Sequence, residues 1–72
     1  MSVHTVYVEL LDEGVRSWRP VQADHLGADR YRLHGPIPAN ETWAFRPGEV
    51  VCCREQHMSD GVVLVVLARA TG

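Results

Sequence analysis

Residues Val3 to Ala23, VHTVYVELLDEGVRSWRPVQA, carry the clearest indications of the fold that we expect for this chain. The first half of this stretch alternates apolar side chains with polar or aromatic ones, which is typical of a strand with one buried face. An acidic turn follows, in which Gly14 can adopt a positive φ angle. The stretch therefore predicts two strands joined by a turn, the first near residues 3–11 and the second near residues 16–23.

The second of these strands raises a question about Trp18. Its neighbours alternate poorly, because Trp18 and Pro20 share one face while Arg19 and Val21 share the other. Proline cannot donate to a strand ladder, so we expect a β-bulge near Pro20, which would turn both Trp18 and Val21 towards the core and leave Arg16 and Arg19 outside. The alternative interpretation is that the same stretch is an exposed recognition surface.

The rest of the chain predicts three more short strands, near residues 30–34, 50–56 and 62–68. A turn is expected over Asp24–Asp29, a tight turn over Arg46–Glu49, and a hairpin turn at Ser59–Gly61. A long connection, Gly35–Gly48, should fold over the open end of the sheet, with Trp43 and Phe45 forming a lid. No helical periodicity is present, so we expect an all-β fold, a small five-stranded barrel.

Length and composition restrict the possible functions. The 72 residues predict one domain, 1–72, and a net charge of −2 argues against a dedicated nucleic-acid binder. The adjacent Cys52 and Cys53 would point to opposite faces of a strand, so we expect reduced thiols and a reducing compartment. The start of the chain does not resemble a signal peptide, and the longest apolar run, Val62–Ala68, is too short to span a bilayer. We therefore expect a cytoplasmic protein that does not associate with membranes.

Four short motifs, VELLDEG, WRPV, WAFRPGEVV and SDG, together resemble a group of small bacterial proteins that are associated with an SH3-like β-barrel. The resemblance extends from about Val6 to Gly61. It implies an SH3-like fold and a bacterial origin. It implies no catalytic residue, cofactor or substrate.

The residues that commonly carry catalysis or bind metals do not form a recognisable set. The four histidines are scattered, and the adjacent cysteines lack the spacing of a metal knuckle. A nucleophile at Cys52 or Cys53 would need a base, an orienting group and an oxyanion site, none of which the pattern supplies. We therefore expect no catalytic residues, no metal, no cofactor and no enzymatic activity.

Aromatic and arginine side chains are the remaining candidates, and two functions compete for them. In the first, the chain is a protein-interaction or assembly module, in which Tyr7, Trp18 and Trp43 contact a partner protein or peptide. In this interpretation Tyr7 and Trp43 would form a groove with Pro36, and the apolar last strand can build a homodimer through Val62, Leu64 and Val66 or through the alternate set. For Trp18 and Trp43 we nevertheless favour a place in the core, because so small a chain has few large side chains with which to build one.

The alternative function is a nucleic-acid-binding barrel that uses an arginine face over the aromatic side chains. All seven basic residues are arginines, and four of them would form this face. They are Arg16, Arg19, Arg30 and Arg32.

Overall fold

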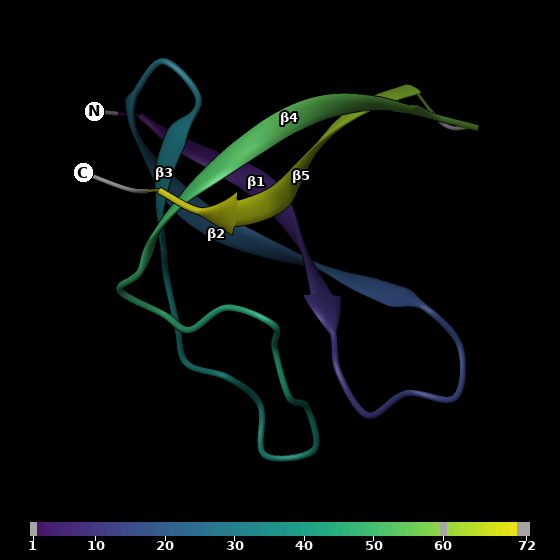
Figure 1. Cartoon of the computed structure of the whole chain (residues 1–72). Helices are drawn as coiled ribbons and strands as arrows, with labels where there is room; N and C mark the ends of the chain where they lie inside the picture. The colour runs from purple at the N-terminus through teal and green to yellow at the C-terminus, as the bar shows by residue number, and fades with distance from the viewer. Residues whose placement is uncertain (1, 60, 71–72) are drawn as a thin grey trace.

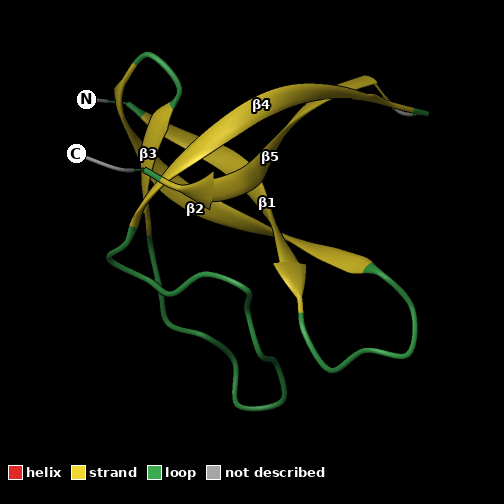
Figure 2. Ribbon diagram, in the orientation of Figure 1, coloured by secondary structure: helices red, strands yellow, loops and turns green. Residues whose placement is uncertain are grey.

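All five predicted strands are present in a computed structural model of the chain, which describes residues 2–59 and 61–70 (Figures 1 and 2). The prediction of an all-β fold is confirmed. The strands are β1 (Val3–Leu10), β2 (Ser17–Gly27), β3 (Arg30–Leu33), β4 (Val50–Met58) and β5 (Gly61–Arg69).

The strands form one sheet that closes on itself. Strands that follow each other in the chain are also neighbours in the sheet, and each of these pairs is antiparallel. β1 and β5 close the ring through a short parallel contact, in which Val6 is paired with Leu64 and Tyr7 with Val65. Closure gives most of the strands a partner on both sides, which limits the length of unpaired sheet edge.

The core lies inside this ring and is built from the residues that alternation places on the inner face. Val6, Val8, Leu33 and Val51 are the largest of its fully buried side chains. Leu10, Ile37, Phe45 and Leu64 are partly buried and pack against the core. The other core members are Val21, Ala23, Tyr31, Trp43, Cys53 and Val66.

The boundaries of four strands differ from the prediction by one or two residues, but β2 extends much further than expected. It continues to Gly27, and the predicted turn over Asp24–Asp29 shrinks to Ala28 and Asp29. A β-bulge between His25 and Gly27 makes this possible, because it lets β2 keep pairing with β3 up to the turn. The prediction ended β2 too early because Asp24 and Gly27 are residues that favour turns.

The predicted bulge near Pro20 is wrong. The β1–β2 register runs without a shift from Val3–Asp24 to Leu10–Ser17, and Tyr7 lies opposite Pro20. β3 pairs with β2 only from Ala23 onward, so β2 has a strand on one side only at Pro20, where a proline is tolerated. Trp18 therefore stays on the outer face, whereas Val21 is buried.

The tight turns are confirmed in part. At Arg46–Glu49 the Glu49 N–H donates to the Arg46 carbonyl over 3.2 Å, and Gly48 has the positive φ of 89° that the third position of such a turn requires. The acidic turn after β1 differs, because Asp12 rather than Gly14 adopts the left-handed conformation, with φ of 61°. Aspartate tolerates this region better than most residues. The hairpin between β4 and β5 is confirmed by the pairing of Met58 with Gly61, while Asp60 lies outside the described residues.

The long connection between β3 and β4 folds over one end of the ring, as predicted (Figure 2). Trp43 forms a bridge with Leu10, and two backbone hydrogen bonds flank it: Leu11 N–H donates to the Thr42 carbonyl over 2.7 Å, and Ala44 N–H donates to the Glu9 carbonyl over 2.9 Å. Trp43 is only 7% exposed. The connection therefore completes the core at this end.

The last strand is covered on both faces over its middle part. Val66 belongs to the core, whereas the neighbouring Val65 is buried on the opposite side of β5, next to Tyr7. Pairing shifts after Val66, because Cys53 opposes Val66 and Cys52 opposes Ala68, so that Leu67 is an extra residue. Neither of the two alternating sets from which we expected a homodimer contact forms one exposed face. In the first set Val66 is in the core and only Val62 is largely exposed, and in the alternate set Val65 is buried and only Leu67 is largely exposed. In the described part of the chain, no helix is long and apolar enough to cross a membrane.

Candidate functional site

The outer face of β1 and β2 brings together three of the predicted site residues. Because the β1–β2 register is unbroken, Tyr7 lies opposite Pro20, and Trp18 lies opposite Glu9 on the next outward-facing pair. Tyr7 and Trp18 are diagonal neighbours on this face, a spacing across which aromatic side chains reach one another. Both are only partly buried, and Pro20 is exposed.

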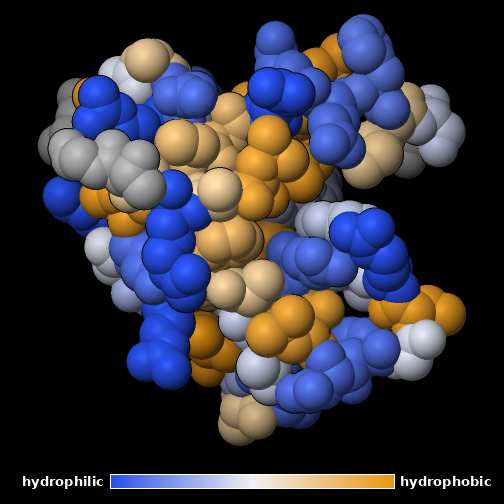
Figure 3. All heavy atoms as spheres, viewed as in Figure 1, coloured by the Kyte–Doolittle hydropathy of each residue, from blue (hydrophilic) through white to orange (hydrophobic). Residues whose placement is uncertain are grey.

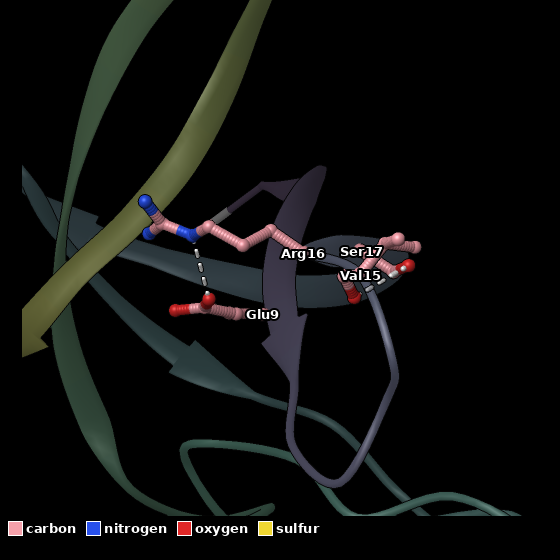
Figure 4. A network of polar contacts seen from close by, with 4 residues as sticks. All are labelled: Glu9, Val15, Arg16 and Ser17. Atoms are coloured by element: carbon pink, nitrogen blue, oxygen red, sulfur yellow. Dashed lines mark hydrogen bonds and ion pairs between the residues drawn. The ribbon is translucent and has the colours of Figure 1, made fainter.

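Arg16 completes this surface from the loop before β2. Its guanidinium carbon lies 5.2 Å from the centre of the Trp18 ring, within the range of a cation–π contact. Its Nε atom donates a hydrogen bond to Oε2 of Glu9 over 3.2 Å, and Figure 4 shows the side chain reaching from the loop to this carboxylate. We call Tyr7, Arg16, Trp18 and Pro20 the outer patch.

The geometry of Arg16 leaves most of its donors available. The Arg16 side chain is 76% exposed, and within residues 2–59 and 61–70 Glu9 is its single ion-pair partner, through Nε alone. The terminal guanidinium nitrogens thus remain open to solvent beside the Trp18 ring. Guanidinium groups bind carboxylates through two parallel hydrogen bonds, so the patch offers an anion-binding group next to an apolar surface.

Trp43 is placed in the core and not in a binding groove. Its Nε1–H donates to Oε1 of Glu41 over 3.0 Å, and Oε2 of Glu41 lies 3.2 Å from Arg19. Arg19 and Trp43 are therefore joined through Glu41, which ties the long connection to β2. The groove expected from Tyr7, Trp43 and Pro36 does not form, because Trp43 and Pro36 line a small pocket of about 180 Å³ beside Arg19, while Tyr7 points outward from β1.

Arg30 and Arg32 lie in a different part of the molecule. Both are exposed on β3, and in the strand register Arg32 lies opposite Asp24 of β2. Asp24 is seven residues along β2 from Ser17, a separation of roughly 23 Å at about 3.3 Å per residue. Arg30 lines a pocket of about 380 Å³ with Leu26 and other residues at that end. The four predicted arginines therefore do not form one face.

A histidine and tyrosine cluster that the sequence did not indicate lies at the start of β1. The rings of His25 and Tyr31 stack with centroids 4.7 Å apart, and the His4 ring meets both edge-on. His4 and Tyr31 also line a pocket of about 440 Å³ that Cys53 and Glu55 border. Only the register of β1, β2 and β3 brings these residues together, so no spacing in the sequence reveals them.

The two cysteines point to opposite sides of β4, as predicted, and both are free thiols. Burial, followed by the charges of Cys52 and Asp29, raises the pKa of the Cys53 thiol to about 12. A thiol that stays protonated at neutral pH is a poor nucleophile. Among the described residues, no group of three or more histidine, cysteine, aspartate or glutamate side chains is arranged to hold a metal ion.

Comparisons with protein-family models, with curated proteins and with solved structures gave no match. The resemblance to small SH3-like proteins therefore stays a prediction.

Proposed function

We propose that this chain is a non-enzymatic protein-interaction module that binds an extended segment of a partner protein on the outer patch. The observation that carries this proposal is the exposed Arg16 guanidinium held over Trp18 on the outer face of a strand pair. Tryptophan, tyrosine and arginine are the residues that most often dominate the binding energy of protein interfaces.

The shape and chemistry of the outer patch favour an extended peptide as the bound segment. Tyr7, Trp18 and Pro20 lie along the outer side of two paired strands, where Pro20 is exposed and the two aromatic side chains are partly exposed. Surfaces of this kind hold extended and proline-rich segments by contact with aromatic rings. The binding segment therefore needs an apolar or proline side chain that rests on Tyr7 and Trp18.

Arg16 adds a requirement for a negative charge in the bound segment. Its side chain is 76% exposed, and beside Trp18 its Nε donates a hydrogen bond to Glu9. A carboxylate of the partner can accept two hydrogen bonds from the terminal nitrogens of Arg16. The preferred partner segment thus carries an aspartate or glutamate next to its apolar residue.

The nucleic-acid alternative receives less support from this arrangement. Phosphate binding gains affinity from several arginines on one surface. Here Arg16 stands near one end of β2, Arg19 is paired with Glu41, and Arg30 and Arg32 lie at the other end. If a single-stranded oligonucleotide does bind, and if the Arg30→Ala, Arg32→Ala double variant abolishes that binding, the arginines of β3 are the functional surface and the outer patch is not.

Selection from a random peptide library displayed on phage tests the proposed function. Against the wild-type chain, we expect enriched peptides that pair an acidic residue with an apolar or proline residue. The Arg16→Gln variant should lose the acidic preference, and the Trp18→Ala variant should lose binding altogether. An Arg32→Gln variant is the matched control, because it removes an exposed arginine outside the patch. Peptides that bind the Trp18→Ala variant as well as the wild type would overturn the proposal.

We also propose that the closed ring belongs to the SH3-like class of small barrels. The support is the number of strands, their sequential antiparallel order, and the contact between the first and last strands. Fold class alone assigns no function, so the binding proposal depends on the outer patch and not on this classification.

A further inference from the structure

The hairpin of β4 and β5 extends beyond the ring as a two-stranded arm. β3 pairs with β4 only at Val50–Cys52, and β1 pairs with β5 only at Leu64 and Val65. From Arg54 to Met58, β4 therefore has β5 on one side and no described strand on the other. Figure 1 shows the arm reaching away from the other strands, and Figure 3 shows a hollow that separates it from the loop between β1 and β2. We call Arg54–Met58 the free edge.

The backbone groups of the free edge can be assigned from one hydrogen bond. The Cys53 N–H donates to the Asp29 carbonyl over 2.8 Å, so it points away from β5. Backbone groups of successive strand residues point to alternate sides, so the N–H and C=O groups of Glu55 and His57 point the same way as those of Cys53. Among residues 2–59 and 61–70 these groups have no strand partner, and such an edge is a template for another strand.

The side chains of the free edge can complement those of the same edge in a second copy of the chain. In an antiparallel pair of two copies, outward-pointing residues must oppose each other, so the two-fold axis can lie at Glu55, Gln56 or His57. An axis at Glu55 places two carboxylates opposite each other, and an axis at His57 places two imidazoles opposite each other. An axis at Gln56 places each Glu55 opposite the His57 of the other copy.

The register centred on Gln56 also fits the space along the edge. It pairs Arg54 of one copy with Met58 of the other, and the pairing stops where the Asp29 carbonyl already accepts the Cys53 N–H. Every side chain from Arg54 to Met58 is exposed, so none has to leave the core to make the contact. Each Glu55–His57 pair can exchange two backbone hydrogen bonds and bring a carboxylate beside an imidazole.

We propose that two copies of this chain associate through the free edge of β4, in antiparallel register around Gln56. The occupant of the edge is a second copy because, in this register, each Glu55 carboxylate lies opposite the His57 imidazole of the other copy and no like charges oppose each other. The contact surface is small, so association is weak and depends on protein concentration. This edge is separate from the outer patch, and the proposed dimer does not depend on the peptide-binding function.

Charge exchange between copies tests the proposal. Glu55→Arg places an arginine opposite His57 of the other copy, and His57→Glu places a glutamate opposite Glu55. Each variant alone should dimerise about tenfold more weakly than the wild type. An equimolar mixture of the two variants should associate again, because glutamate then faces arginine and histidine across the axis.

Sedimentation equilibrium at protein concentrations up to about 1 mM reads out the mass, and circular dichroism confirms that each variant is folded. Glu13→Arg is the matched control, since it makes the same charge change at an exposed position outside the arm and should leave dimerisation unchanged. A wild-type chain that stays monomeric at the highest concentration would overturn the proposal. So would single variants that dimerise as strongly as the wild type, or a mixture that associates no better than either variant alone. The phage selection reports on the outer patch independently of these results.

Discussion

Raising the pH should destabilise the protein through Cys53. The Cys53 side chain is 5% exposed, and its burial in the core raises the pKa of the thiol from an ordinary value of 9.0 to about 12. The unfolded chain releases this proton at a lower pH than the folded chain. The stabilising contribution is therefore fully present below about pH 9 and is lost as the pH rises towards about pH 12. At about pH 10 the loss relative to pH 7 amounts to about 1.4 kcal/mol.

This loss is large enough to measure, because a domain of this size is stable by only roughly 4–11 kcal/mol. Urea unfolding followed by tryptophan fluorescence, at several values between about pH 7 and about pH 10, gives the free energy of unfolding in each condition. The same series on Cys53→Ala removes the thiol. Tyr31 still titrates in this variant with a raised pKa, because burial is the largest cause of that shift and the charge of Cys53 only the second. Each protein is compared with its own free energy of unfolding near neutral pH, so the constant cost of the cavity left by the substitution cancels from the comparison.

The wild type should lose about 1.4 kcal/mol more than Cys53→Ala over this range. Cys52→Ala is the control. Cys52 is only half-buried, and its charge is a smaller cause of the raised Cys53 pKa than burial, so this variant should keep most of the alkaline loss. Parallel curves for the wild type and Cys53→Ala would refute the reasoning, because they would mean that the Cys53 thiol ionises equally in both states.

Three further predictions concern packing and charge. Trp43→Ala should lower the free energy of unfolding by about 3–5 kcal/mol and Trp18→Ala by no more than about 1 kcal/mol in urea titrations, and equal losses would contradict their placement. Gly35→Ala should cost about 1–3 kcal/mol, because its new Cβ would lie 2.9 Å from a proline ring, whereas Gly14→Ala meets nothing within 4 Å and should leave the melting temperature unchanged or slightly higher. The pKa of Glu49 is lowered by hydrogen bonds to its carboxylate, first from the backbone N–H of Arg46 and then from the Arg69 side chain. The ionised Glu49 therefore stabilises the folded chain above the ordinary pKa of 4.5, and this stabilisation is lost as the pH falls through the lower pKa of the folded state. The stability difference between the wild type and Glu49→Gln should therefore vanish in acid, and a constant difference would show that the pKa is not lowered.

Much of the fold follows from local patterns in the sequence. The alternation around Val6 and Val8 predicts β1 and its inner face, and the covering of both faces of β5 follows from its continuous aliphatic run. The end of β2 could not be predicted, because Asp24 and Gly27 favour turns and only pairing with β3 keeps them in the strand. The predicted orientation of Trp18 was wrong for a similar reason. We expected a bulge at Pro20, but a proline is tolerated there without one because β2 has a neighbouring strand on one side only.

The candidate site was predictable as a set of residues but not as an arrangement. Arg16 and Trp18 stand two residues apart in the sequence, so their proximity is visible there. Their contact with Glu9 depends on the register between two strands, which the sequence pattern does not specify once a bulge is allowed. The free edge of β4 was not predicted, because it results from the short pairing of β3 with β4 and has no local signature.

Exposure of Trp18 is the most direct test of the outer patch. The chain has two tryptophans, so Trp43→Phe leaves the emission of Trp18 alone, and Trp18→Phe leaves that of Trp43. Quenching by acrylamide, a neutral molecule that Arg16 does not attract, should be several-fold more efficient in Trp43→Phe than in Trp18→Phe. Trp18 emission that is shielded as strongly as that of Trp43 would place its ring in the core and would contradict the proposed binding surface.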